Sequence, residues 1–380
     1  MSRPPQSVPA RPRVLMLGLR GFPGVQGGVE THAENLCPHL VDQGWDVEVI
    51  TRKPYHPPAV GREWRGARLT PVWSPRKNGL EPMIHSALAV LRAAVTRPDI
   101  VHIQAIGPAF VTPLARLLGL KVVVTHHGPD YDRQKWGGFA RLVLRLGERF
   151  GMRWSQAQIV ISRTIFELVR AKHGVEATII PNGVVAPDIP ASHGCLDELG
   201  LAPRRYVLLV SRLVPEKRHL DLMQAFLAAD MPGWKLVLAG AADHESSYVN
   251  EVRALAAQSD RIVMAGFRTG LALRELYAHA GVFVLPSSHE GLPIALLEAL
   301  SYGLPSLASA IPANLEVGLA KEAYFQLGNR DELARKLTLA ASTGRVEGSV
   351  STQQVLDRYD WRKVAASTAD VYRRLLSGRR

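Results

Sequence analysis

The sequence predicts an α/β protein built from two parallel-sheet domains that face each other across a cleft. Short apolar runs alternate with longer amphipathic segments, which is the pattern of a parallel sheet covered by helices. This pattern fills the first half of the chain, stops at a proline-containing stretch and then starts again. With 380 residues, the chain has the length of two domains at the usual ~150 residues each.

The candidate strands are short runs rich in branched apolar residues. In the first half they are Val14–Leu19, Val47–Thr51, Ile100–Gln104, Val122–Thr125, Gln158–Ile161 and Thr178–Ile180. In the second half they are Tyr206–Val210, Lys235–Ala239, Ile262–Ala265, Val282–Leu285 and Ser306–Ser309. Helices are expected between them, among others at Val29–Gln43, Arg163–His173, Leu220–Ala229, Tyr248–Gln258 and Ile294–Tyr302.

The stretch Val184–Pro203 contains three prolines and few apolar residues at regular spacing, so we interpret it as the linker between the domains. The expected domains therefore cover residues 1–188 and 189–360. Residues 361–380 follow them with a helical period, and this C-terminal helix could pack on its own domain or cross back to the first.

The composition excludes several classes of protein. Apolar residues make up 47% and charged residues 21%, which is ordinary for a globular protein and too apolar for a disordered one. The two cysteines, Cys37 and Cys195, are too few for a disulfide framework or a multi-cysteine metal site. No apolar run approaches the ~18–20 residues that span a bilayer. We therefore expect a cytoplasmic protein, attached at most to a membrane surface.

The positive charge is concentrated in the first domain. Residues 1–188 contain 24 Lys and Arg against 14 Asp and Glu, a net charge of +10, whereas the remaining residues have a net charge of +2. Four arginines recur every four residues beside an apolar stripe on one expected helix: Arg141, Arg145, Arg149 and Arg153. This pattern fits either a solvated helix face or adhesion to anionic lipid, and the charge of the whole domain favours the membrane.

The loop after the first strand contains no dinucleotide or P-loop fingerprint. It does place Gly27 and Gly28 at the start of a probable helix. Without side chains, their backbone N–H groups could approach an anion at the positive end of that helix. A flexible turn is the alternative interpretation.

Two loops of the second domain carry the strongest signal for an anion site. Arg212 and Lys217 lie five residues apart across a tight turn, so both cations can converge on a diphosphate. Pro293 belongs in the first turn of a helix, and the N–H groups of Gly291 and Leu292 would point out of that end toward phosphate oxygens.

Two carboxylates flank this predicted phosphate pocket. Glu298 lies five residues along the helix from Pro293, ~7.5 Å at 1.5 Å per residue, which is about the offset from a diphosphate to its ribose. Glu290 precedes the helix and would face the group beyond the diphosphate. This arrangement suits a nucleotide sugar. The alternative interpretation is that Glu298 is an exposed helical glutamate.

The sequence resembles the retaining family-four glycosyltransferases. The segment from Glu290 to Pro305 resembles their E-x7-E motif, and Ser211–Lys217 resembles their G-R-L-x-x-E-K segment. Three further segments resemble family motifs in the same order along the chain: Gly27-Gly28, Thr125–Gly128 and Ile180–Val184. Arg20–Pro23 followed by Gly27–Thr31 also resembles a bacterial subgroup that includes rhamnosyltransferases of capsule and exopolysaccharide synthesis.

The resemblance implies a GT-B fold, with an acceptor-binding first domain, a nucleotide-sugar-binding second domain and the site between them. It implies that Arg212 and Lys217 hold the donor diphosphate and that Glu298 binds the ribose. The catalytic residues it implies are His127, Glu290, Arg212 and Lys217. The donor-binding residues it implies are Gly27, Gly28, Asn182, Arg212, Lys217, Glu290, Gly291, Leu292 and Glu298. Ser211 and Arg218 depart from the family pattern, where glycine is usual, but neither change removes a functional group.

The resemblance also implies the reaction: a sugar moves from a UDP-, dTDP- or GDP-sugar to a hydroxyl of a saccharide, with retention of configuration and without a metal or other cofactor. The residues do not distinguish these donors. Asp130-Tyr131-Asp132 forms a D-x-D, but it follows His127 in the first domain, away from the predicted diphosphate site, so we assign it no metal. We expect a lipid-linked acceptor in surface polysaccharide synthesis, reached from the inner face of the plasma membrane.

Three alternatives compete with this interpretation. A nucleotide-sugar epimerase can share the two-domain fold and would act on the donor alone. A glycosyltransferase with a soluble acceptor would need no membrane. A nucleic-acid-binding protein would account for the charge, but the sequence has no helix-turn-helix, RRM or zinc pattern and such a protein would leave Glu290 and Glu298 unexplained. We therefore expect no nucleic-acid partner.

Overall fold

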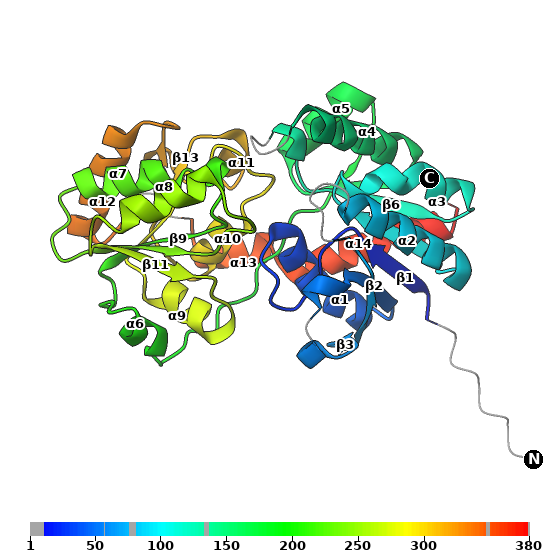
Figure 1. Cartoon of the computed structure of the whole chain (residues 1–380), viewed down its shortest axis with the longest axis horizontal. Helices are drawn as coiled ribbons and strands as arrows, with labels where there is room; N and C mark the ends of the chain where they lie inside the picture. The colour runs from blue at the N-terminus through cyan, green and yellow to red at the C-terminus, as the bar shows by residue number, and fades with distance from the viewer. Residues whose placement is uncertain (1–10, 57, 76–80, 133–136, 347–349, 379–380) are drawn as a thin grey trace, which may run out of the picture.

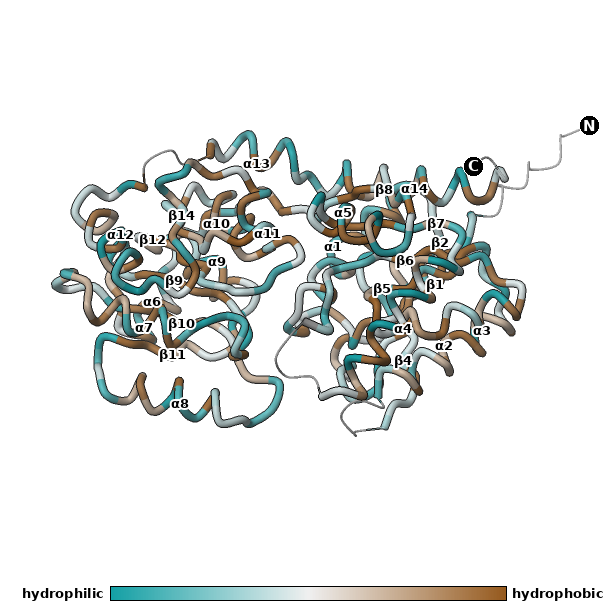
Figure 2. Tube along the Cα trace, turned by 90° about the horizontal axis from the view of Figure 1, so that it is seen from above, coloured by the Kyte–Doolittle hydropathy of each residue, from teal (hydrophilic) through white to brown (hydrophobic). Residues whose placement is uncertain are grey.

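A computed structural model of the chain describes residues 11–378 except residue 57 and residues 76–80, 133–136 and 347–349. It contains two α/β domains that lie side by side along the long axis of the molecule (Figure 1). Figure 2 shows the same separation from a view turned by 90°. Each domain has a sheet at its centre and helices on both faces.

The first sheet has eight strands in the order β3-β4-β2-β1-β5-β6-β7-β8. All neighbouring strands are parallel except β3 and β4, which form an antiparallel edge. The strands are β1 (Arg13–Leu17), β2 (Asp46–Arg52), β3 (Glu63–Trp64), β4 (Ala67–Val72), β5 (Ile100–Gln104), β6 (Val122–His126), β7 (Ala157–Val160) and β8 (Thr178–Ile179).

The second sheet has six parallel strands in the order β11-β10-β9-β12-β13-β14. They are β9 (Tyr206–Val210), β10 (Lys235–Ala239), β11 (Ile262–Gly266), β12 (Val282–Leu285), β13 (Ser306–Ser309) and β14 (Tyr324–Phe325). The strand order reverses beside β9, as it does beside β1 in the first sheet. Ligands of doubly wound sheets bind at the carboxyl ends of the strands at such a reversal.

Helices cover both sheets with their apolar faces inward. The first domain contains α1 (Gly28–Asp42), α2 (Glu81–Thr96), α3 (Thr112–Leu117), α4 (Gly138–Trp154) and α5 (Arg163–His173). The second contains α6 (Gly194–Glu198), α7 (His219–Ala228), α8 (Ser247–Ala256), α9 (Gly270–His279), α10 (Ile294–Ser301), α11 (Pro312–Leu315), α12 (Arg330–Thr343) and α13 (Thr352–Arg358). Short 3-10 turns connect them: η1 (Lys53–Tyr55), η2 (Pro58–Val60), η3 (Pro108–Val111), η4 (Asp130–Asp132), η5 (Pro215–Lys217) and η6 (Lys321–Ala323).

The last helix, α14 (Trp361–Leu376), packs on α1 of the first domain, where Figure 1 shows it in red. The chain thus passes between the domains twice, and the two passages lie together. The N–H of Val184 donates to the carbonyl of Tyr359 at 2.7 Å, and Val184 forms a parallel bridge with Asp360. Trp361 packs so closely on Gly183 that a Cβ there would lie 2.5 Å from the indole ring.

In the second sheet, four strands have the bounds that the sequence predicted. In the first sheet, one strand does. The other predicted strands differ from the observed ones at their ends. The first strand stops at Leu17 rather than Leu19 because Gly18 has a φ of +105° and lies against the backbone of Gln104. The sequence did not reveal β3, β4 or β14. Pro71 interrupts the pattern of β4, and the other two strands have only two residues each.

The predicted linker is partly folded onto the second domain. Its residues Gly194–Glu198 form α6, which packs on α9. Glu275 of α9 anchors this segment, since its carboxylate accepts from the Cys195 N–H at 2.7 Å and from the Ser192 hydroxyl at 2.6 Å.

Candidate active site

The loops that follow β6 and β12 touch each other between the two domains. A Cβ added to Gly128 would lie 3.5 Å from the Cα of Gly291, and a Cβ added to Gly291 would lie 2.1 Å from the carbonyl oxygen of His127. The missing side chains therefore let the two backbones come together. This contact lies at the carboxyl ends of strands from both sheets, where the fold predicts a ligand site.

The turn after β9 lies against the loop that follows β12. The N–H of Ser288 donates to the carbonyl of Glu216 at 2.8 Å, and Nζ of Lys217 contacts Oε1 of Glu290 as an ion pair. Arg212, at the start of the same turn, donates from Nη1 to Oδ2 of Asp243 at 2.8 Å. The structure thus places Lys217 against the residue before Gly291, and each of the two predicted cations already has a carboxylate partner.

The amino end of α10 faces this cluster. The helix begins at Ile294, as predicted, but Pro293 is its N-cap residue rather than part of its first turn. Among the described residues, no side chain caps this end with a hydrogen bond. The proline offers no side-chain acceptor to the first N–H groups of the helix, and the positive end of the helix dipole favours an anion there.

Glu298 lies about one turn into α10, and its Oε2 accepts a hydrogen bond from the Tyr277 hydroxyl at 2.9 Å. Burial raises the pKa of Glu298 from 4.5 to about 7, and the hydrogen bond from Tyr277 offsets part of this rise. A carboxylate in such surroundings gains from donors that arrive with a ligand, as two vicinal hydroxyls would.

His127 forms the first-domain wall of the site. Its Nε2–H donates to the side-chain oxygen of Gln104 at 2.7 Å. Burial, together with the neighbouring His32 and His102, lowers the pKa of His127 well below 6.5. The imidazole is therefore neutral near pH 7, and with Nε2 acting as donor, Nδ1 is an acceptor.

Asn182 is buried behind this wall. Its side-chain oxygen accepts from Nδ1 of His32 at 2.9 Å, and its amide donates to the carbonyl of Leu292 at 3.4 Å. Leu292 is buried as well. Asn182 thus connects α1 of the first domain to the loop that leads into α10.

Gly27 and Gly28 lie at the amino end of α1, as the sequence predicted. A Cβ on Gly27 would lie 2.0 Å from the Glu30 carboxylate, so only glycine fits there. A Cβ on Gly28 would meet nothing within 4 Å. Gly28 therefore leaves open space at the start of the helix, and its contact with a donor stays a prediction.

Four residues that the sequence did not assign to the site lie within it. They are Arg20, His32, Gln104 and Asp243. Arg20 belongs to the segment that resembles the bacterial subgroup, and this resemblance could have pointed to it as a site residue. No sequence pattern pointed to the other three residues, because their hydrogen-bond partners lie far away in the sequence.

The four arginines of α4 are exposed, and so are two of the apolar residues near them. Phe139 and Leu142 are 74% and 53% exposed. The helix packs inward through Gly147, which lies against the backbone just before η3, through Gly151, which lies against side chains of η3 and β6, and through the buried Glu148. The outer face of α4 thus combines cationic and apolar side chains.

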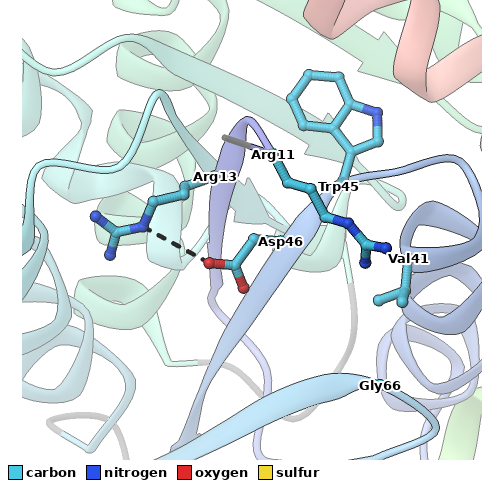
Figure 3. A pocket seen from close by; sticks show the side chains of 6 residues that line it. All are labelled: Arg11, Arg13, Val41, Trp45, Asp46 and Gly66. Atoms are coloured by element: carbon cyan, nitrogen blue, oxygen red, sulfur yellow. Dashed lines mark ion pairs between the residues drawn. The ribbon is translucent and has the colours of Figure 1, made fainter. Parts of the chain in front are cut away.

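A hollow on the first domain is not part of this site. It lies at the amino ends of β1 and β2, where Arg13 pairs with Asp46 at 3.8 Å beside Trp45 (Figure 3). The candidate site lies at the opposite ends of the strands. Among the described residues, no group of three His, Cys, Asp or Glu could hold a metal ion, and no helix is long and apolar enough to cross a membrane.

Two family models match most of the chain. "Glycosyltransferase Family 4" matches residues 26–186, and "Glycosyl transferases group 1" matches residues 198–347. A glycogen synthase of Mycobacterium tuberculosis is 25% identical over 404 aligned residues, which cover 95% of this chain and 94% of the relative. A GDP-mannose:cellobiosyl-diphosphopolyprenol alpha-mannosyltransferase of Xanthomonas oryzae is 26% identical over 310 aligned residues, 77% of each protein.

The fold is that of known glycosyltransferases as well. HepE of Anabaena, solved in complex with UDP-glucose, superimposes with a TM-score of 0.77 over 94% of this chain and 98% of HepE, at 19% identity. The two family models and the two-domain architecture lead to the same assignment. The chain is a family-four glycosyltransferase with the GT-B fold.

Proposed function

We propose that the protein transfers a sugar, with retention of configuration and without a metal, from a nucleoside diphosphate to a hydroxyl of a lipid-linked saccharide in surface polysaccharide synthesis. The observation that carries this proposal is the amino end of α10, where Pro293 provides no side-chain cap and Lys217 pairs with Glu290 just before the helix, with Arg212 at the start of the same turn as Lys217. Glu298 lies further along the same helix, at the distance of a ribose from a diphosphate.

The residues act on the charge that develops as the diphosphate leaves. The bond between the anomeric carbon and the phosphate oxygen breaks, and a bond to the acceptor oxygen forms on the same face. The acceptor proton passes to the departing diphosphate. Arg212, Lys217 and the N–H groups of α10 stabilise the added negative charge, and such preorganised donors contribute several kcal/mol.

Two side chains orient the transferred sugar. Glu290, next to the phosphate pocket, accepts hydrogen bonds from sugar hydroxyls. His127 accepts one through Nδ1, because Gln104 holds its Nε2–H. Asn182 keeps the loop before α10 in place through its hydrogen bond to Leu292.

The outer face of α4 supports a membrane-bound acceptor. Exposed arginines attract anionic lipid, and the exposed Phe139 and Leu142 can enter the headgroup region. The Xanthomonas relative, by its name, acts on a diphosphopolyprenol-linked saccharide. We therefore infer that this protein works at the cytoplasmic surface of a membrane.

A panel of UDP-, dTDP- and GDP-sugars tests the proposal, with released nucleoside diphosphate as the readout. Glu298→Ala and Lys217→Ala should each abolish the signal, and EDTA should leave it unchanged. Separate reactions without acceptor, with a soluble glucan and with a polyprenyl-diphosphate saccharide identify the acceptor class. Epimerised donor in the reaction without acceptor, or turnover that neither substitution affects, would contradict the proposal.

A further inference from the structure

Two arginines from opposite domains converge on one carboxylate beside the candidate site. Arg20, in the loop after β1, donates from Nη1 to Oδ1 of Asp243 at 2.9 Å. Arg212, in the loop after β9, donates from Nη1 to Oδ2 of the same carboxylate at 2.8 Å. Asp243 itself lies in the loop after β10, the neighbour of β9 in the second sheet. Three loops thus bring the two guanidinium groups to opposite oxygens of the same carboxylate.

Arg20 is held in this orientation by its own domain. Its Nε donates to Oε1 of Glu30 at 3.2 Å, and its Nη2 donates to the carbonyl of Gln26. Its guanidinium also lies 5.5 Å from the centre of the Tyr55 ring. The side chain is only 15% exposed, so it would lose little rotamer freedom when it binds a ligand.

The loop that carries Arg20 also reaches the second domain at another point. The side-chain oxygen of Gln26 accepts from the N–H of Ala241 at 3.3 Å. Arg20 is therefore a cation of the first domain that its own domain holds in contact with loops of the second domain. An anion bound between Arg20 and Arg212 would be in contact with both domains.

The charges at this point balance before any ligand arrives. Lys217 is paired with Glu290, and the two arginines are paired with Glu30 and Asp243. A diphosphate brings two or more negative charges, so the carboxylates already paired with these cations compete with it. Asp243 is the most exposed of the three acids, at 24% of its side chain against 8% for Glu30 and 10% for Glu290. It is the one that can turn into solvent.

We propose that Arg20 binds the donor diphosphate from the first domain, and that Asp243 occupies the phosphate position between Arg20 and Arg212 while the cleft is empty. Two guanidinium forks that hold a carboxylate also suit phosphate oxygens, because both anions accept paired N–H donors. This inference rests on the proposed function. It adds a third cation to the donor site and makes donor binding dependent on the contact between the domains.

Calorimetric titration with UDP, GDP, dTDP and the corresponding nucleosides tests the proposal. Arg20→Met keeps the length of the side chain but removes its charge, and should weaken nucleoside diphosphate binding by about tenfold or more, the value of a charge-assisted contact. Nucleoside binding should not change. Asp243→Asn removes the competing charge and should tighten diphosphate binding several-fold.

Arg68→Met is the matched control, because Arg68 is another first-domain arginine, paired with Asp46 at 2.8 Å on the sheet edge. It should bind like the wild type. Arg20→Met affinity within twofold of the wild type, or weaker binding by Asp243→Asn, would overturn the inference and leave the proposed function standing. A wild-type protein that binds none of the three nucleoside diphosphates would overturn both.

Discussion

Glu298 is the residue whose chemistry gives the sharpest solution test. Its pKa of about 7 in the empty protein lies above the ordinary value of 4.5 because the carboxylate is buried. Deprotonation therefore disfavours the fold, and the contribution of Glu298 to stability falls as the pH rises from about 4.5 through 7. Ribose hydroxyls that donate to the carboxylate would favour its ionised form and lower this pKa again.

We predict that nucleoside diphosphate binding releases a proton near pH 7 and strengthens as the pH rises from 6 to 8. Calorimetric titration in buffers of different ionisation enthalpy measures the number of protons released. Glu298→Gln, which cannot ionise, is the control and should release markedly fewer. Proton uptake, or equal release by both proteins, would separate Glu298 from the nucleotide site.

The backbone contact at Gly291 supports a second prediction at the scale of single residues. Gly291→Ala places a methyl group 2.1 Å from the carbonyl oxygen of His127, so the two domains must move apart. Transferase activity should fall at least about 100-fold, as expected for ~1 Å misplacement of reacting groups. Gly138→Ala, at the start of α4 with open space around it, should keep full activity. Equal activity of the two variants would show that this contact has no role in turnover.

At the scale of elements, the sequence predicted segments with one regular pattern and missed those whose form depends on distant partners. Ile100–Gln104 and Tyr206–Val210 were predicted to the residue because central parallel strands are continuous apolar runs. The inward face of α4 was not predicted, because Gly147 and Gly151 give the close packing there and periodicity alone favours larger apolar residues. The turn from Arg212 to Lys217 was predicted because its residues are close together in the sequence. Asp243 follows a different strand and comes next to Arg212 only in the folded chain, so it was missed.

The outer face of α4 carries its own prediction. Arg141→Gln with Arg145→Gln should lower binding to anionic vesicles ~25-fold at low salt, since each basic residue near such a surface contributes about 1 kcal/mol. Co-sedimentation with anionic and neutral vesicles measures this change in binding. Arg68→Gln with Arg373→Gln removes one arginine of the first domain and one of α14, which packs on it; both pair with aspartates, and their loss should change binding far less. Equal binding of the wild type to both kinds of vesicle would discard the membrane proposal.

At the scale of the whole molecule, Trp361 connects the path of the chain to the site. It is buried where the chain returns to the first domain, packs on Gly183 and lies edge-on to His32 at 5.4 Å between ring centres. His32 in turn bonds Asn182, which holds the loop before α10. Neither domain alone contains this set of contacts, which explains why the sequence did not predict it.

Trp361→Ala should therefore disturb both the stability of the protein and its donor site. Loss of a buried tryptophan costs about 3–5 kcal/mol in unfolding free energy, which denaturant titration measures. Trp154→Ala, which removes a tryptophan that is 47% exposed, should cost far less. Because Asn182 depends on this packing, Trp361→Ala should also weaken nucleoside diphosphate binding under conditions where it remains folded. A destabilised variant that binds the nucleotide as tightly as the wild type would mean that the returning helix supports the fold but not the site.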